Sequence, residues 1–149
     1  MRSQSGQSLF EIMLALAITT LIIVAIVALT ATSIRNTTFS KNKTLATRYS
    51  QEATEWLRGE RDADFEVFEG RALIPQYCLP SLSWVAATVG ACGAGQEIID
   101  TPFKREISFS ISVVNDKTLI QASINVYWTD AQGLHEVRSV TNFSDWREI

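Results

Sequence analysis

The strongest constraint on the fold is a stretch of 23 residues without a charged side chain, Ile12 through Ile34. As an α-helix, at about 1.5 Å per residue, this stretch would be about 35 Å long, enough to cross a hydrocarbon core of about 30 Å. It is far longer than the apolar region of about 7 to 15 residues in a secretory signal peptide. Small side chains at Ala28–Ser33 keep cleavage near Ala31 open as an alternative. The sequence therefore predicts a helix that spans a membrane.

The apolar stretch leads into a second helical pattern. Beyond residue 35, apolar side chains recur at intervals of three and four and so lie on one helical face; they are Leu45, Tyr49, Ala53, Trp56 and Leu57. We predict one helix over Leu9–Arg58, with a membrane half at residues 7–34 and an amphipathic half at residues 35–58. Gly59 is its expected end, because a glycine just after the last periodic residue accepts the left-handed conformation that closes helices.

Residues 59–102 show no sustained periodicity and hold all three prolines, which predicts an irregular connection with short strands. Both cysteines, Cys78 and Cys92, lie in this connection. In an oxidising compartment the simplest interpretation is a disulfide, and closing a loop of about 15 residues stabilises a fold by about 3 kcal/mol. Two buried free thiols are the alternative. The predicted span favours the disulfide, because it can place this region outside the cytoplasm.

After residue 102 the apolar period changes to two, the period of a strand with one buried face. The alternating segments are Glu106–Val113, Ala122–Trp128 and, more weakly, Val137–Phe143. Turns are expected between them, at Asn115–Thr118 and Thr129–Gly133, so residues 103–149 form an antiparallel meander. Its apolar face needs cover, which the amphipathic half of the helix can supply. The predicted fold class is α+β, a long helix packed on a small antiparallel sheet.

The composition disfavours several kinds of site. A structural zinc ion needs four ligands, and the sequence has one histidine and two cysteines, so we expect no metal site. The histidine, His135, lies at the exit of a predicted turn, a poor place for a catalytic triad. The glycines at Gly90–Gly95 have no strand pattern before them and no helix pattern after them, which indicates a flexible loop and not a phosphate-binding loop. We therefore expect no catalytic residue, no cofactor and no enzymatic activity.

Charge is unevenly distributed along the chain. Residues 35–62 carry six basic and four acidic side chains, whereas residues 63–149 carry six basic and eleven acidic ones. The negative C-terminal part repels phosphates, which disfavours nucleic acid as a partner. The cations that follow the span outnumber Arg2 and the amino terminus; they are Arg35, Lys41, Lys43 and Arg48. Taken alone, the positive-inside rule would place the C-terminal domain in the cytoplasm.

The amino terminus carries a more specific signal. Gly6 ends a short polar leader, residues 1–6, and Glu11 lies five residues later, at the threshold of the apolar stretch. An unpaired acidic side chain there would cost up to a few kcal/mol in lipid. Glu11 therefore needs a partner.

This segment resembles the type IV pilin-like family, in particular its minor pilins and the minor pseudopilins of type II secretion. The resemblance rests on Gly6, on Gln7-Ser8-Leu9-Phe10-Glu11 after it, and on the apolar helix that follows. The segment from Ala46 to Asp62 is similar to PilV-like minor pilins and I-like pseudopilins. The resemblance is specific over residues 6–62 and architectural beyond them.

The resemblance implies cleavage after Gly6 by a prepilin peptidase and N-methylation of Gln7, in the place where family members usually have Phe. It also implies that Glu11 meets the terminal amine of a neighbouring pilin or pseudopilin subunit. Residues 7–34 would be a transmembrane and assembly helix, and residues 35–149 an extracytoplasmic pilin-like domain. The protein would wait in inner membrane lipid as a single-pass protein and then enter a cell-surface or periplasmic filament. Because the motif is the more specific signal, it outweighs the charge count.

A different function class stays open, a single-pass membrane-anchored sensor or binding module whose helix is only an anchor. It would leave Gly6 and Glu11 without a role. Trp84 or Trp146 could then bind a partner, although a lone tryptophan is more often part of a core or an isolated surface residue. A periplasmic enzyme released by cleavage near Ala31 is a third possibility, and no convergent set of catalytic residues supports it.

Overall fold

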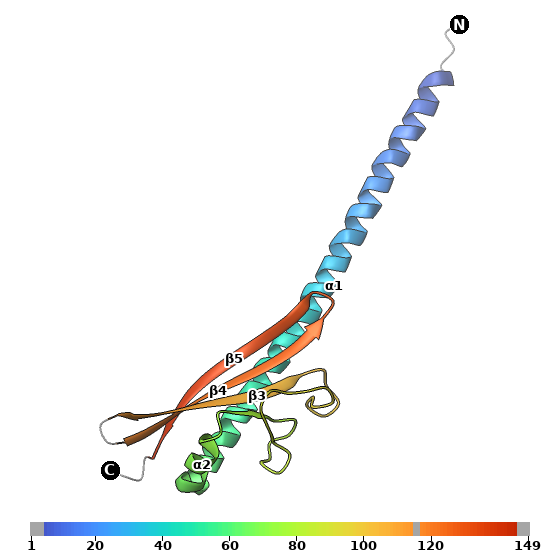
Figure 1. Ribbon diagram of the computed structural model, residues 1–149. Coiled ribbons are helices and arrows are strands. Elements are labelled where there is room, and N and C mark those ends of the chain that lie inside the picture. The colour runs from blue at the N-terminus through green and yellow to red at the C-terminus, as the bar shows by residue number, and fades with distance from the viewer. Residues whose placement is uncertain (1–4, 115–116, 146–149) are drawn as a thin grey trace. The chain divides into compact units, whose positions relative to one another are not determined.

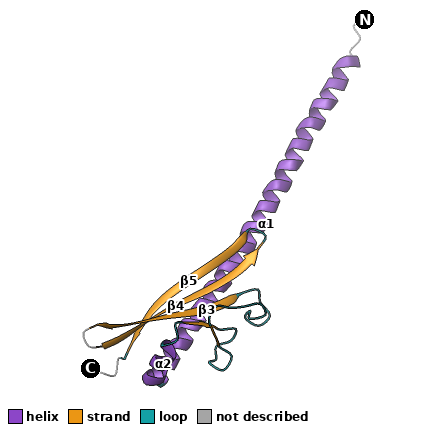
Figure 2. Cartoon of the chain, viewed as in Figure 1, coloured by secondary structure: helices purple, strands orange, loops and turns teal. Residues whose placement is uncertain are grey.

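The computed structural model describes residues 5–114 and 117–145. The elements are α1 (Ser5–Ala63), α2 (Phe65–Ala72), β1 (Gln76–Cys78), β2 (Thr88–Val89), β3 (Lys104–Val114), β4 (Lys117–Asp130) and β5 (Gly133–Ser144). The fold class is α+β, with a long N-terminal helix and an antiparallel sheet, as the sequence predicts (Figures 1 and 2).

The chain divides into two compact units, Met1–Lys41 and Asn42–Ile149. In the described residues the first unit is the N-terminal part of α1, and its side chains from Leu9 to Lys41 are all exposed. The second unit holds the rest of α1, together with α2 and the sheet. The first fully buried residue is Ala46. The boundary therefore lies seven residues beyond the predicted end of the membrane half at residue 34, because side chains start to be buried only after it.

The sheet has the strand order β2-β1-β3-β4-β5, and all its pairings are antiparallel. The three long strands form the predicted meander, in which Ile124 of β4 lies between Ile107 of β3 and Ser139 of β5. The predicted alternation is confirmed on β4, where the buried residues are Ile120, Ala122, Ile124, Val126 and Trp128. The short strands β1 and β2 lie in the connection and extend the meander to a five-stranded sheet.

Both turns differ from the prediction. The residues between β4 and β5 are only Ala131 and Gln132, because Thr129 and Asp130 still pair with Leu134 and Gly133. Gly133 has φ of 120°, a conformation that favours glycine and lets the chain reverse so tightly. At the other turn, Lys117 and Thr118 already belong to β4, and Asn115 and Asp116 lie outside the described residues.

The core of the second unit forms between the C-terminal part of α1 and one face of the sheet (Figure 1). On α1 the fully buried residues follow helical spacing; they are Ala46, Ser50, Ala53, Thr54 and Leu57. Of the predicted apolar face, Leu45, Tyr49 and Trp56 are only partly buried and pack at its margin. Small residues occupy the centre of the contact, because they let the helix approach the large side chains of Phe103, just before β3, and of the strand residues Ile107 and Phe143.

The helix does not end at Gly59, as predicted, but continues to Ala63. Positive φ angles among the described glycines occur at Gly90, Gly95 and Gly133, so Gly59 keeps the right-handed helical conformation. The last turn is held from outside the helix. Glu60 accepts a hydrogen bond of 2.7 Å from the indole N–H of Trp84, and the Arg61 guanidinium lies 5.8 Å from the centre of the Phe143 ring.

The segment after α1 is not wholly irregular, because α2 forms at its start. Asp64 adopts an extended conformation that separates α1 from α2. Its carboxylate accepts a 3.0 Å hydrogen bond from the backbone N–H of Val67 and so caps α2. Phe68 is fully buried, with its ring 5.3 Å from that of Phe143 and 6.0 Å from that of Phe109. This packing stabilises a helix of only eight residues, too short to persist alone.

One charged side chain lies inside the core. Arg105 of β3 has 2% of its surface exposed, and its guanidinium donates to the backbone carbonyls of Leu79 at 3.2 Å and Tyr49 at 3.4 Å. The Leu79 backbone N–H in turn donates to the Arg105 carbonyl at 2.8 Å. Arg105 thus connects the sheet, the chain after β1 and the helix. Burial lowers the pKa of its guanidinium.

Candidate functional site

The N-terminal motif lies on the first turns of α1. Gly6 and Gln7 belong to this helix, whereas the side chains of residues 5–8 and all of residues 1–4 lie outside the described part. Glu11 is exposed, and none of the ion pairs found among the described residues includes it. The motif therefore presents a carboxylate, about one to two helical turns from Gly6, that has no charged partner in the described part of its own chain.

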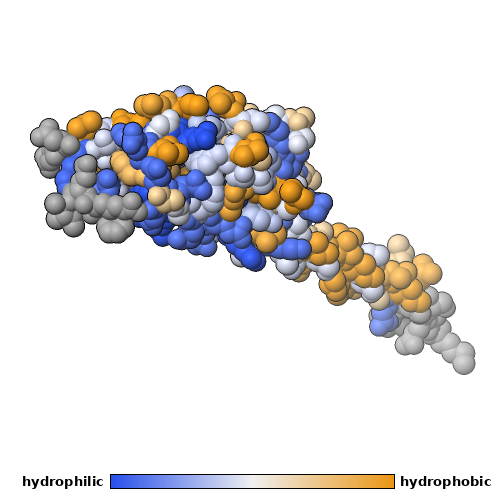
Figure 3. Space-filling model, turned by 90° about the horizontal axis from the view of Figure 1, so that it is seen from below, coloured by the Kyte–Doolittle hydropathy of each residue, from blue (hydrophilic) through white to orange (hydrophobic). Residues whose placement is uncertain are grey.

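The apolar side chains that follow Glu11 are uncovered. The exposed fractions of Leu9, Leu21 and Leu29 are 67%, 71% and 71%, and none of the most apolar window of α1 is buried. Figure 3 shows hydrophobic residues gathered along the N-terminal part of the helix. By length and composition, α1 is the one helix among the described residues that could cross a membrane.

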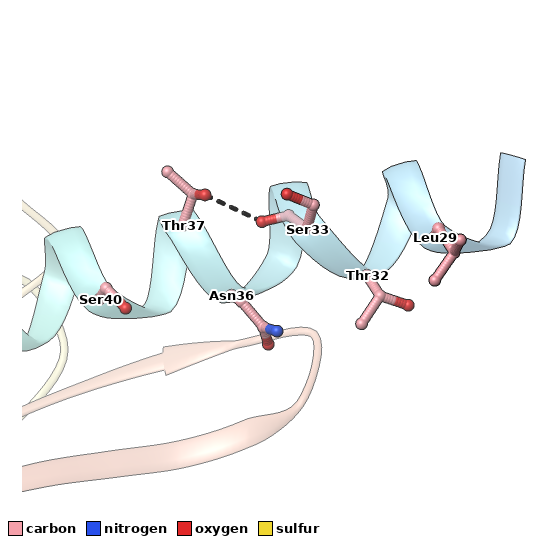
Figure 4. A pocket seen from close by; sticks show the side chains of 6 residues that line it. All are labelled: Leu29, Thr32, Ser33, Asn36, Thr37 and Ser40. Carbon is pink, nitrogen blue, oxygen red and sulfur yellow. Dashed lines mark hydrogen bonds between the residues drawn. The ribbon is translucent and has the colours of Figure 1, made fainter. Parts of the chain in front are cut away.

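Several threonine hydroxyls along this helix donate hydrogen bonds to backbone carbonyls of the same helix. Four threonines donate to a backbone carbonyl three or four residues earlier, at 2.7 to 2.9 Å; they are Thr19, Thr20, Thr30 and Thr32. Figure 4 shows the same contact from Thr37 to the Ser33 carbonyl, 2.9 Å long, beside a shallow groove on the helix lined by Leu29, Asn36 and Ser40. Such bonds reduce the cost of placing hydroxyl groups in an apolar environment.

The two cysteines form the expected disulfide. The Cα atoms of Cys78 and Cys92 are 4.9 Å apart, and the bond joins the end of β1 to the loop after β2. The glycines of this loop are turn residues: Gly90 and Gly95 have φ of 97° and 77°. The disulfide thus constrains the segment of the fold that has the least regular structure.

A polar network beside the disulfide was missed from the sequence. The Glu106 carboxylate accepts hydrogen bonds from the Cys92 backbone N–H at 2.8 Å, the Tyr127 hydroxyl at 2.8 Å and the Gln76 amide at 3.0 Å. Burial, and then the hydrogen bond to Glu106, raise the pKa of Tyr127 to about 12. Nothing in the alternating pattern marks Glu106, because its place on the outer face of β3 is an ordinary place for a charge. Its role is to attach the cysteine loop to the sheet.

Of the other aromatic and histidine candidates, Trp84 and His135 lie in the described part of the chain. Trp84 is half-buried, and its ring packs 4.7 Å from Trp56 and 5.3 Å from Tyr77, so it is part of the core margin and not an exposed binding residue. Trp146 lies outside the described residues. His135 lies on β5, 2.9 Å from a carboxylate oxygen of Asp130 across the hairpin. Within the described ranges, no group of three or more His, Cys, Asp and Glu side chains could hold a metal ion.

No protein-family model, curated protein or solved structure matches this chain. Two features stand out among those described, the exposed apolar helix with Glu11 at its start and the disulfide-closed domain on the other part of α1. The first offers a surface for packing in lipid or against other helices, and the second offers a folded domain outside the apolar region.

Proposed function

We propose that the chain is a minor pilin or minor pseudopilin subunit, processed at the membrane and incorporated into a type IV pilus-like filament through packing of its N-terminal helix. The observation that carries the proposal is Glu11, an exposed carboxylate five residues after Gly6 and directly before 23 residues without a charge. A carboxylate in lipid is costly unless it has a partner. A helix that served only as an anchor would not need one at this place.

Before assembly the subunit is a single-pass protein of the inner membrane, with residues 35–149 outside the cytoplasm. The disulfide supports this side of the membrane, because disulfides persist in oxidising compartments and are rare in the cytoplasm. The prepilin peptidase cleaves after Gly6 and leaves Gln7 as the methylated amino terminus. The other partners are pilin or pseudopilin subunits, and the mature form lies in a cell-surface or periplasmic filament.

Assembly depends on packing and not on catalysis. When the apolar helix moves from lipid into a bundle of like helices, both environments are apolar, so the hydrophobic gain is small and polar contacts set the register. Two opposite charges 4 Å apart attract by about 4 kcal/mol at an effective dielectric constant near 20. Desolvation costs about as much. The contact between Glu11 and a neighbour's terminal amine therefore contributes specificity of position more than net stability.

The substitution Glu11→Gln tests this role. Loss of the charge leaves a neighbour's amine unpaired in an apolar bundle, at a cost of about 3 to 5 kcal/mol by analogy with broken buried pairs. In a strain that makes the whole filament, the ratio of sheared-filament protein to membrane protein should fall, while membrane level and processing persist. Glu55→Gln is the matched control, because Glu55 is an exposed glutamate on the same helix, paired with Arg58 at 2.6 Å. An unchanged ratio for Glu11→Gln would favour the membrane-anchored binding module.

Mass spectrometry of the mature amino terminus tests the processing step. The membrane form should begin at Gln7, with a mass that includes one methyl group. A Gly6→Leu variant should keep its leader, because a side chain at this position would crowd a peptidase groove that accepts bare backbone. A membrane form that retains Met1, or that begins near Thr32, would contradict the proposal.

A further inference from the structure

The end of the apolar stretch carries cations that the proposed packing does not use. Between Ile12 and Gln51 the sequence has no acidic residue, and the first cations after the stretch are Arg35 and Lys41. Both lie on α1 within the first compact unit and both are exposed. None of the ion pairs among the described residues includes either of them. Within the first unit, these two charges are therefore left uncompensated after the apolar stretch; Lys43, which is also exposed and also outside these ion pairs, follows in the second unit.

We propose that Arg35 and Lys41 bind the phosphates of anionic phospholipids at the outer border of the membrane and so fix the depth at which the subunit waits before assembly. The inference rests on the proposed function, because it requires the apolar stretch to span a bilayer. It adds a lipid class and two binding residues to that function.

The depth of the two residues fits a headgroup layer. Residues 12–34 are about 35 Å long as a helix, so Arg35 follows directly after the length that covers the hydrocarbon core. Lys41 lies about 9 Å further along the axis, close to the thickness of one headgroup layer, which is about 5 to 8 Å. Long arginine and lysine side chains bend towards the phosphates while their stems stay on apolar surface. Both cationic groups can therefore reach phosphate oxygens.

Their directions favour lipid over a protein partner. At about 100° per residue, six residues turn the helix by about 600°, so Arg35 and Lys41 point about 120° apart. A protein docked on one face of the helix would contact Arg35 and Lys41 less easily at the same time than lipid, which surrounds the helix. Neighbouring threonines do not compete for the phosphates, because Thr37 and Thr38 donate to backbone carbonyls at 2.9 and 3.1 Å.

The charge sign selects anionic lipid. Cations are usually concentrated on the cytoplasmic side of a span, so two cations on the proposed outer side indicate a specific interaction with negative charge there. Each basic residue near a membrane surface increases the affinity for anionic lipid by about fivefold. Arginine can also hold a phosphate through two parallel N–H groups.

The test uses the full chain reconstituted in phosphatidylcholine bilayers. Electron paramagnetic resonance measures the motionally restricted fraction of spin-labelled phosphatidylglycerol and of spin-labelled phosphatidylcholine beside the helix. For the parent we expect a severalfold preference for phosphatidylglycerol. It should weaken between about 0.01 M and 1 M salt, over which the Debye length falls from about 30 Å to about 3 Å. The double substitution Arg35→Gln, Lys41→Gln should remove most of this preference.

The matched control is Arg58→Gln, Lys104→Gln, which also removes one arginine and one lysine charge, but from the second compact unit. It should keep the parent's preference. An equal preference in the parent and in the double variant would overturn the inference while leaving the span intact. If no restricted lipid appeared at all, the span itself, and with it the proposed function, would fail. Protein cross-links between copies that disappear in the double variant, without any lipid preference in the parent, would assign the cations to the acidic domain of a second copy and also overturn the inference.

Discussion

Replacement of the buried Arg105 should cost less free energy of unfolding when the new side chain fills the same space. We compare Arg105→Met, which keeps an apolar side chain of similar length, with Arg105→Ala, which leaves a cavity. Both variants remove the hydrogen bonds to the carbonyls of Leu79 and Tyr49. The two substitutions therefore separate the contribution of volume from that of hydrogen bonding.

The magnitude follows from the surroundings of the side chain. Tyr49 lies inside α1, where helical carbonyls already accept a hydrogen bond from the backbone, so the main loss falls on the Leu79 carbonyl, about 1 to 3 kcal/mol. Part of this loss is offset, because the cost of burying an arginine charge disappears in both variants. We expect a net loss of about 1 kcal/mol for Arg105→Met. The cavity adds about 2 kcal/mol or more for Arg105→Ala, within the range for truncating large core side chains.

Urea unfolding followed by tryptophan fluorescence measures this difference. All four tryptophans lie beyond residue 41, so the signal reports the second compact unit. With an m-value of about 1.5 kcal/mol per M, a difference of about 2 kcal/mol separates the midpoints of the two variants by about 1.3 M. If Arg105→Met lowered the midpoint as much as Arg105→Ala, the guanidinium hydrogen bonds and not the filled volume would hold this part of the core, and the reasoning would be refuted.

Three further predictions concern the same unit. The double substitution Cys78→Ala, Cys92→Ala should lower the free energy of unfolding by about 3 kcal/mol, and alkylation of the denatured, unreduced parent should label no thiol; two reactive thiols would contradict the disulfide. The raised pKa of Tyr127, about 12 against about 10 when unfolded, favours the neutral phenol in the fold, so its contribution to stability is complete below pH 10 and is lost as the pH rises towards 12. Between about pH 9 and 11 the urea midpoint should therefore fall more steeply for the parent than for Tyr127→Phe, and equal slopes would refute this. Asp64→Ala should cost about 1 kcal/mol through loss of the α2 cap, while Asp64→Asn should cost much less; equal losses would argue against capping.

The elements that the sequence predicts well are those whose pattern is local. The length of the apolar stretch, the helical spacing after it and the alternation in β4 and in the first half of β3 each reflect a pattern that one segment carries by itself. In the second half of β3 the prediction of a buried apolar face is wrong, because Ile111 and Val113 are exposed there. The disulfide could be predicted because two cysteines allow a single pairing within the chain. The spacing from Gly6 to Glu11 is equally local; the structure shows Glu11 exposed at the start of the apolar stretch, and the roles of the two residues stay predictions.

The other features of the fold depend on contacts between residues that are far apart in the sequence. The propensity of Gly59 to end a helix is outweighed, because Trp84 and Phe143 hold the following turn through Glu60 and Arg61. The short helix α2 has no lasting period to reveal it and is stabilised by the aromatic rings around Phe68. Arg105 and Glu106 look like ordinary strand residues in the sequence. In the structure, Arg105 is buried and donates to the Leu79 carbonyl, and Glu106 accepts a hydrogen bond from the Cys92 backbone in the disulfide loop. A periodic pattern shows which face of a segment is apolar, whereas the residues that meet that face come from elsewhere in the chain, and only the tertiary structure determines them.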